Sequence, residues 1–298
     1  EVAFDAKAKG LAMVDAPVSG GTAGAEAATL TFMVGGDARD FEAAKAVLQA
    51  INRALAIKAF ALAAEFGELE IAGARERFFR EAEMAGRLNH PNIVVIYDAG
   101  EDQGLAFIVM EYLRGRHLSD HTAAGKMLPT ATVLDIAARV ADALHFAHRQ
   151  KVIHRDIKPA NIMYDADNNA LKITDFGIAR LTDGGSTKTG IVLGTPSFMS
   201  PEQLEGPHLD GRSDLFALGI SLFQLLCGQL PFRADSMTAL MQKIVNEPHT
   251  PLLSIRPDLP PAIDRIINYA LAKNPDDRYQ TGAEMATALR AAQNSGAG

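Results

Sequence analysis

Apolar residues recur at helical spacing over most of the second half of the chain. The clearest case is 129–149, where one stripe of apolar side chains predicts a long amphipathic helix: Val133, Ile136, Ala137, Val140, Leu144 and Ala147. Residues 215–227 are apolar on all sides, which predicts a buried central helix. Shorter helices are expected near 236–246, 261–273 and 282–292, followed by a frayed polar tail over 293–298. This half of the chain is therefore expected to be mainly helical.

The middle of the chain predicts strands around a single helix. Residues 54–58 have the pattern of a short strand that ends in a lysine, and 75–88 has Phe78, Ala82, Ala85 and Leu88 at helical spacing. The apolar runs 93–97 and 105–110 predict a hairpin with its turn at 100–104. Two more strand-like runs, 152–153 and 162–164, lie on either side of a short polar loop. A loop between strands is a common place for catalytic groups.

The first fifty residues have a different character, since they are rich in Ala and Gly. Residues 11–18 and 29–34 predict short buried strands, with glycines between them, and Asp37 is expected to cap a helix that runs to about residue 50. We interpret residues 1–50 as a separate α/β segment.

Composition and charge narrow the class of protein. Of the 298 residues, 48% are hydrophobic, which is enough for a sizeable core. The net charge of −7 argues against nucleic acid as a partner. The one cysteine, Cys227, lies in an apolar run and is expected to be a buried residue of a reducing compartment. Because we find neither a membrane span nor a signal peptide, we expect a soluble, cytoplasmic chain.

The polar loop carries the candidate chemistry. It reads His-Arg-Asp-Ile-Lys-Pro-Ala-Asn over 154–161, and Asp-Phe-Gly follows at 175–177. These two motifs resemble the catalytic loop and the metal-binding motif of eukaryotic-like serine/threonine protein kinases of bacteria. The resemblance implies an α+β, bilobal kinase fold with a mainly helical C-terminal lobe. It also implies ATP and Mg²⁺ as cofactors and proteins bearing Ser or Thr as substrates.

The same resemblance implies a role for each matching residue. Asp156 would accept the proton of the attacking hydroxyl, and Lys158 would meet the γ-phosphate. Asn161 and Asp175 would supply oxygen ligands to magnesium. The remaining ATP-binding residues would be Lys58 on the α- and β-phosphates, Glu81 paired with Lys58, and Ala56, Met110, Glu111, Leu113 and Met163 around the adenine. Glu83 is a rival to Glu81 for the ion pair.

Other residues match structural and regulatory positions of the family. The resemblance implies scaffold roles for His154, for Asp214, which would brace the catalytic loop, and for an ion pair between Glu202 and Arg278. Residues 183–189 are rich in Gly, Ser and Thr, and Arg155 directly precedes Asp156. We hypothesise that another copy phosphorylates Thr187 or Thr189, that the phosphate pairs with Arg155, and that the two copies need only transient contact. Unchanged activity after both threonines are replaced by alanine would contradict this hypothesis; an incidental solvated loop is the alternative.

The resemblance has a defined gap. No glycine-rich phosphate loop of the kinase type lies between Ile51 and Lys58, and the glycines at 20–24 and 35–36 lack its spacing. We therefore expect a truncated N-terminal lobe over 51–112, with the third to fifth strands and one helix, and a C-terminal lobe over 113–292. The strings 14–21 and 30–36 instead resemble a β-hydroxyacid dehydrogenase of the 3-hydroxyisobutyrate type, as a fragment without a cofactor site.

Three readings of function follow from the sequence. The first is a serine/threonine kinase that is impaired by the missing loop. The second is a kinase-like binding module, catalytically weak or inactive, that arose by truncation or gene fusion. The third, a dehydrogenase, lacks the family's dinucleotide fingerprint and catalytic lysine.

Overall fold

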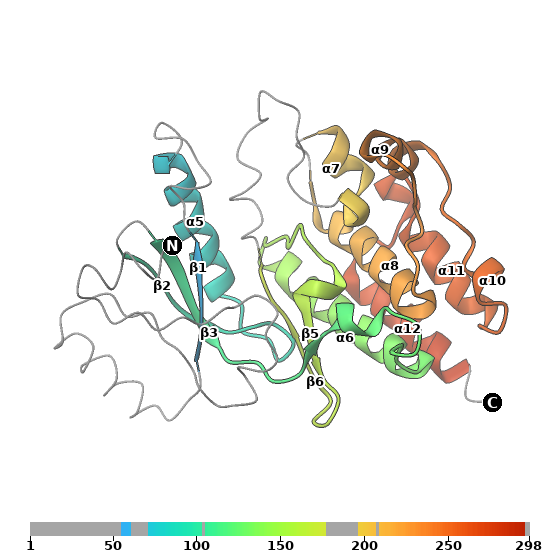
Figure 1. Cartoon of the computed structure of the whole chain (residues 1–298), viewed down its shortest axis with the longest axis horizontal. Coiled ribbons are helices and arrows are strands. Elements are labelled where there is room, and N and C mark those ends of the chain that lie inside the picture. Colours follow the sequence, from blue (N-terminus) through green and yellow to red (C-terminus); the bar gives the residue numbers. More distant parts are fainter. Residues whose placement is uncertain (1–54, 61–70, 103–104, 177–195, 207–208, 296–298) are drawn as a thin grey trace. The chain divides into compact units, whose positions relative to one another are not determined.

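The protein divides into two compact units in the computed structural model, which describes residues 55–60, 71–102, 105–176, 196–206 and 209–295 (Figure 1). Of these, the first unit contains 55–60, 71–79, 95–102 and 105–112, and the second contains 80–94 and the residues from 113 onward. The predicted 1–50 segment, with its two strands and its helix, lies outside the described residues.

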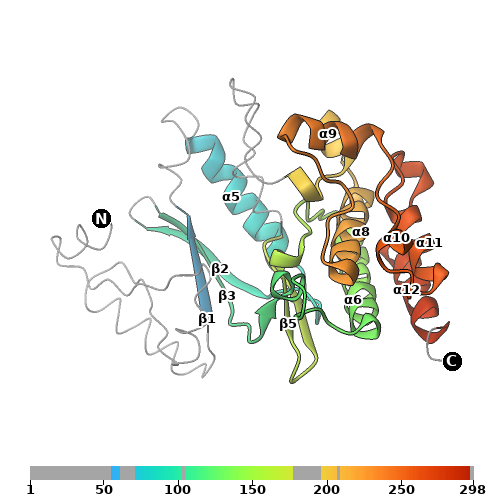
Figure 2. The same ribbon diagram turned by 45° about the vertical axis from the view of Figure 1, so that its right-hand side comes forward.

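The first unit is built on an antiparallel sheet in the order β1-β3-β2 (Figure 2). Its strands are β1 (Leu55–Phe60), β2 (Ile96–Asp102) and β3 (Leu105–Glu111). Alternate residues of β3 are buried, as expected for a strand with one face on a core. The helix α5 (Ile71–Gly86) contributes Phe78, whose ring centroid lies 5.5 Å from that of Phe60. The predicted strand at 54–58 and the predicted helix at 75–88 are confirmed, although the helix begins four residues earlier.

The predicted hairpin is wrong in its details. The predicted turn begins at Gly100, but β2 continues to Asp102, and Gly100 lies inside this strand opposite Phe107. A Cβ atom at Gly100 would lie 2.5 Å from the Phe107 ring. Glycine is therefore required here because the Phe107 side chain packs against the backbone, and not because the chain turns. Ile93 and Val94 are not in β2; they pair with Ile173 of the second unit.

Residues 80–94 group with the second unit through these and similar contacts. The His90 ring lies 5.2 Å from the Phe146 ring, and the Asn92 side chain donates to the carbonyl of Leu171 at 3.0 Å. The division therefore cuts α5 near its middle. The lobe boundaries at 51–112 and 113–292 stay predictions.

The second unit combines a small sheet with helices. The sheet has the order β4-β5-β6, and β4 and β6 were not predicted from the sequence. Its strands are β4 (Arg116–His117), β5 (Ile162–Asp165) and β6 (Ala170–Ile173). The α-helices are α6 (Thr130–Arg149), α7 (Pro201–Glu205), α8 (Gly211–Cys227), α9 (Met237–Asn246), α10 (Leu252–Ile255), α11 (Pro261–Ala270) and α12 (Gly282–Ser295). The short 3₁₀ segments are Leu118–His121, Pro159–Asn161, Pro196–Phe198 and Pro275–Asp277.

The predicted central helix is confirmed as α8, which lies among the other helices of this unit (Figures 1 and 2). It begins four residues before the apolar run, because the Asp210 side chain accepts a hydrogen bond from the amide of Arg212 and caps the first turn. It ends at Gly228, whose φ of 73° lies in the left-handed region that favours glycine. Cys227, in the last turn, is half-buried, whereas the sequence predicts a buried residue.

Two further predictions at element ends need correction. Residues 152–153 are not a strand: the amide of Val152 donates to the carbonyl of Ala147, which closes the end of α6 instead. The tail expected from residue 293 is helical as far as Ser295, and the Gln293 side chain bonds to the carbonyl of Ala131. Within the residues described, no helix combines the length and the apolar character that crossing a membrane requires.

Candidate active site

A buried histidine, His154, anchors the polar loop 154–161 at its first position. His154 is fully buried, and its Nε2 atom lies 2.8 Å from the carbonyl oxygen of Thr174. Its Nδ1 atom accepts a hydrogen bond from the amide of Asp156 at 3.2 Å. Because a carbonyl can only accept and an amide can only donate, the proton of this ring is on Nε2. The ring also packs against Phe176, with 4.5 Å between the centroids.

Asp214 holds the start of the loop from the first turn of α8. Its carboxylate accepts hydrogen bonds from the amides of His154 at 2.8 Å and Arg155 at 2.7 Å. The same carboxylate lies 2.7 Å from Nε2 of His148, a residue that the sequence did not single out. Burial by itself would raise the pKa of Asp214, but the hydrogen bond and the charge of His148 outweigh it, and the pKa lies below the usual range. Spacing alone does not reveal His148 as a partner, since it precedes Asp214 by 66 residues.

Three of the predicted catalytic residues lie together on the loop. The ammonium of Lys158 lies 2.7 Å from Oδ2 of Asp156. The Asn161 amide donates both to this oxygen and to the carbonyl of Asp156, each at 2.8 Å. The side chains of Asp156 and Lys158 keep 29% and 35% of their surface exposed, so both can meet a ligand. The loop therefore presents an oriented carboxylate beside a cation.

The two predicted metal ligands lie just outside the paired strands β5 and β6. Ile162 pairs with Ile173; Asn161 directly precedes β5, and Asp175 lies two residues after the end of β6. The carbonyl of Asn161 accepts hydrogen bonds from the amide and the hydroxyl of Thr174, at 2.9 Å and 3.2 Å. Asp175 has a φ of 63°, an uncommon value for a residue other than glycine.

This pair fits a magnesium ion in the way that the family would use it. The Asn161 amide donates through Nδ2 to Asp156, so its oxygen is the end of the side chain that would bind a cation. Among the described residues no group of three or more His, Cys, Asp or Glu side chains could hold a metal ion. Magnesium commonly binds to one or two carboxylates together with substrate phosphates, so an amide and one carboxylate suit it.

The predicted nucleotide residues divide between the two units. In the first, Ala56 lies opposite Met110, and Lys58 opposite Ile108, in the β1–β3 register. The amide of Glu111 donates to the carbonyl of Val95 at 2.9 Å, and the Glu111 carboxylate accepts from the Val95 amide at 2.7 Å.

The other residues of this set belong to the second unit. Leu113 is its first residue after β3, Met163 lies in β5, and Glu81 is buried on α5. The Lys58–Glu81 ion pair stays a prediction, as do the roles of the other nucleotide residues.

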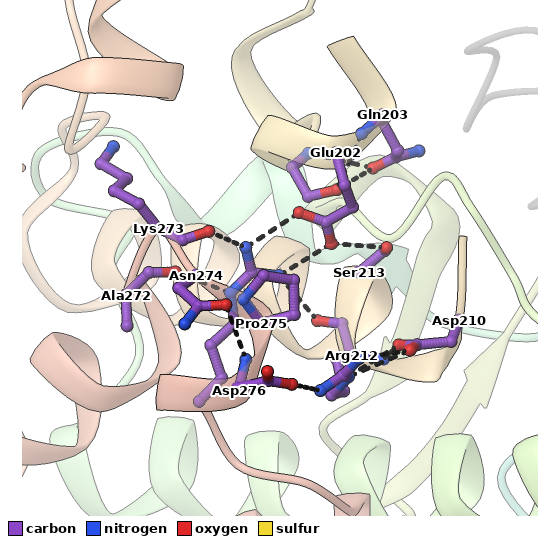
Figure 3. A network of polar contacts seen from close by, with 12 residues as sticks. Glu202, Gln203, Asp210, Arg212, Ser213, Ala272, Lys273, Asn274, Pro275 and Asp276 are labelled. Carbon is purple, nitrogen blue, oxygen red and sulfur yellow. Dashed lines mark hydrogen bonds and ion pairs between the residues drawn. The ribbon is translucent and has the colours of Figure 1, made fainter. Parts of the chain in front are cut away.

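The predicted scaffold pair is present within the second unit. The Arg278 guanidinium is fully buried and forms two parallel hydrogen bonds to Glu202, at 2.8 Å and 2.9 Å. Figure 3 shows that Ser213 also points at Glu202, and its hydroxyl donates to the carboxylate at 2.6 Å. Arg212 extends the network to Asp210 and Asp276 (Figure 3). Sequence reasoning missed Ser213 and Arg212, although they directly precede Asp214.

The pKa of Glu202 follows from these contacts. Burial would raise it, but the hydrogen bonds from Arg278 and Ser213 dominate, and the pKa is lowered. The segment 177–195, with the predicted phosphorylation sites Thr187 and Thr189, lies outside the described residues.

Comparisons with known proteins identify the family of the chain. A family model described as the protein kinase domain matches residues 41–290. A second model, the NAD binding domain of 6-phosphogluconate dehydrogenase, matches residues 1–60 and supports the dehydrogenase-type resemblance of the N-terminal segment.

Bacterial serine/threonine-protein kinases are among the similar sequences and structures. PknB of Mycolicibacterium smegmatis is 45% identical over 216 residues, which is 70% of this chain and 34% of that protein. The kinase pkn3 of Myxococcus xanthus is 43% identical over 226 residues, 72% of this chain and 41% of that protein. The crystal structure of a double mutant of the Mycobacterium tuberculosis PknI kinase domain has a TM-score of 0.65 at 30% identity and covers 80% of this chain and 85% of that chain. The chain thus spans well under half the length of PknB and pkn3. Because the family model matches most of its residues, the chain belongs to the protein kinase domain family.

Proposed function

We propose that this chain transfers the γ-phosphate of ATP to serine or threonine hydroxyls of proteins. The observation that carries the proposal is the arrangement of Asp156, with Lys158 and Asn161 on its carboxylate at 2.7 Å and 2.8 Å. This is a proton acceptor beside a cation, on a loop that is held from below by His154 and Asp214.

In the proposed reaction, the hydroxyl oxygen of the substrate forms a bond to the γ-phosphorus while the bond from that phosphorus to the β–γ bridging oxygen breaks. The hydroxyl proton passes to the carboxylate of Asp156, and the leaving group is ADP. Lys158 offsets negative charge on the transferred group. Asn161 and Asp175 would hold Mg²⁺, which neutralises charge on the phosphates when it is bound.

A binding module with weak or no catalysis is the second candidate. The observation in its favour is that no glycine-rich loop precedes Lys58. Such a loop clamps the phosphates with backbone amides, and a displacement of about 1 Å can cost roughly a hundredfold in rate. We therefore expect slow transfer rather than the full rate of the family.

The test is phosphate transfer by the purified chain. We would incubate it with Mg²⁺ and ATP labelled at the γ-phosphate, with and without a generic basic protein substrate, beside an Asp175→Asn variant and an EDTA control. Slow transfer that both controls abolish supports the proposal. Thermal stabilisation by ATP and Mg²⁺ without transfer would favour the binding module. If the chain shows neither transfer nor thermal stabilisation, both candidate functions are overturned. A rate equal to that of complete kinases would contradict the importance of the missing loop.

Substrate choice and regulation extend this proposal. The protein substrate, the phosphorylation of Thr187 or Thr189 and its pairing with Arg155 remain predictions from the sequence. Transfer between two copies requires only transient contact. The test is whether an active copy phosphorylates a catalytically inactive copy.

A further inference from the structure

Gln203 contacts two different elements with the two ends of its side-chain amide. It occupies the third position of α7, beside Glu202 (Figure 3). Its Oε1 atom accepts a hydrogen bond from the amide of Ser200 at 3.0 Å and lies 3.2 Å from the Ser200 hydroxyl. Its Nε2 atom donates to the carbonyl of Arg155 at 2.9 Å, 48 residues away in the chain. The partners settle the orientation of this amide, because the opposite orientation would face an amide with a donor and a carbonyl with an acceptor.

The carbonyl that Gln203 holds belongs to an uncommon backbone conformation. Arg155 has a φ of 69°, which residues other than glycine rarely adopt. Such a conformation persists only where the surroundings hold it. The amide of Arg155 is held by Asp214 at 2.7 Å, so Gln203 completes the restraint on the carbonyl side.

The peptide group restrained by Gln203 leads directly into Asp156. Its oxygen, on Arg155, accepts from Gln203, and its nitrogen, on Asp156, donates to Nδ1 of His154 at 3.2 Å. Both polar atoms of this peptide plane are therefore held. Since the plane sets the direction in which the Asp156 side chain leaves the backbone, its tilt also sets where the carboxylate lies.

We propose that Gln203 is a positioning residue for phosphoryl transfer: it fixes the Arg155–Asp156 peptide and thereby the carboxylate of Asp156. The other end of the same amide completes the capping box of α7 with Ser200, so formation of this helix start and orientation of the catalytic loop are coupled through one side chain. This inference rests on the proposed function, in which Asp156 accepts the proton.

Two variants separate this role from that of a simple helix cap. Gln203→Glu keeps the oxygen that accepts from Ser200 and adds a charge that a helix N-terminus favours, but it loses the donor to Arg155. Ser200→Ala loses the hydroxyl of the capping box but keeps the donor of Gln203 and the amide of residue 200. Positioning predicts a kcat loss of about 10- to 100-fold in Gln203→Glu with the KM for ATP nearly unchanged, and a smaller loss in Ser200→Ala. A larger loss in Ser200→Ala would contradict it.

The pH dependence gives a signature that a cap would not produce. When the new carboxyl group of Gln203→Glu is protonated, its O–H can donate to the carbonyl of Arg155 again. The ratio of the variant's kcat to that of the wild type should therefore rise as the pH falls from about 8 toward the usual titration range of Glu, near 4 to 5. A ratio that does not change with pH contradicts the restraint.

Hydrogen exchange tests the restraint without relying on activity. The amides of residues 152–158 should exchange faster in Gln203→Glu than in the wild type. Gln293→Glu is the matched control, because Gln293 also donates Nε2 to a backbone carbonyl, that of Ala131, but on an exposed surface; its exchange in 152–158 and its kcat should equal those of the wild type.

The two readouts keep the inference separate from the proposed function. If the wild type shows no transfer, the proposed function fails, and faster exchange still supports the restraint on the loop. Unchanged exchange overturns the inference in either case. Faster exchange with full kcat in an active wild-type background overturns the claim that Gln203 positions Asp156.

Discussion

An Asp156→Asn variant should lose phosphate transfer almost completely and still fold. The amide oxygen of Asn can accept the contacts that Lys158 and Asn161 now make with Oδ2, so the loop keeps its geometry. What is lost is the basic carboxylate that takes the hydroxyl proton. General acid–base groups contribute about 10²- to 10⁴-fold, and we expect a loss of kcat in this range.

The measurement is kcat with labelled ATP, together with the melting temperature in the presence and absence of ATP and Mg²⁺. The matched control is Asp167→Asn, an exposed aspartate in the turn between β5 and β6, which should transfer phosphate like the wild type. An Asp156→Asn variant that loses less than about tenfold in kcat would remove Asp156 from the role of proton acceptor. If the melting temperature of Asp156→Asn falls so far that the variant is largely unfolded in the assay, its loss of activity reports on folding instead.

Arg278→Ala should be the most destabilising single substitution of those considered. The guanidinium is fully buried, binds Glu202 through two hydrogen bonds, and donates to the carbonyls of Ala272 at 2.6 Å and Lys273 at 2.8 Å. It also lies 4.7 Å from the ring centroid of Phe216. Removal leaves a carboxylate and backbone carbonyls without their partner, and breaking a buried pair in this way costs about 3–5 kcal/mol. Since whole domains are stable by only about 5–15 kcal/mol, the variant should be close to unfolding.

Urea unfolding measures this effect. Arg278→Lys keeps the charge but not the planar pair of hydrogen bonds, so it should lie between Arg278→Ala and the wild type and remain measurable if the alanine variant does not fold. Arg87→Ala is the control, because its ion pair with Glu83 is exposed at the end of α5 and such pairs contribute about 0.3–0.5 kcal/mol. Equal losses in Arg278→Ala and Arg87→Ala would contradict the importance of the buried pair.

The same pair predicts the sign of a pH effect. The pKa of Glu202 is lower in the folded protein than in the unfolded chain, so its ionised form favours folding. This stabilisation is complete above the unfolded pKa of Glu, near 4.5, and is lost as the pH falls toward the folded value. The wild type should therefore lose more stability on acidification than Arg278→Lys, whose weaker pairing lowers the pKa of Glu202 less.

Local patterns were sufficient where burial follows the helix itself, on one face of α6 and on all sides of α8. The stripe on α6 and the all-apolar run of α8 predicted both helices, because periodic burial against a core is a local property of the chain. The errors fall where a distant partner decides. The sequence predicts a turn at Gly100, but this residue lies in a strand with Phe107 packed against it. It also predicts that Ile93 belongs to the hairpin, but Ile93 pairs with Ile173.

For the site, the sequence by itself determined which residue types are present and in what order: the loop 154–161, Asp175, and the resemblance that connects them with Lys58, Glu202 and Arg278. Only the tertiary structure decided how the loop is held, because its supports come from far along the chain. Asp214, itself in contact with His148, accepts from the amides of His154 and Arg155, and Gln203 donates to the carbonyl before Asp156. These contacts depend on the tertiary placement of residues from α6, α7 and α8 beside the loop. Hydrogen bonds across 48 to 66 residues leave no periodic pattern in the sequence.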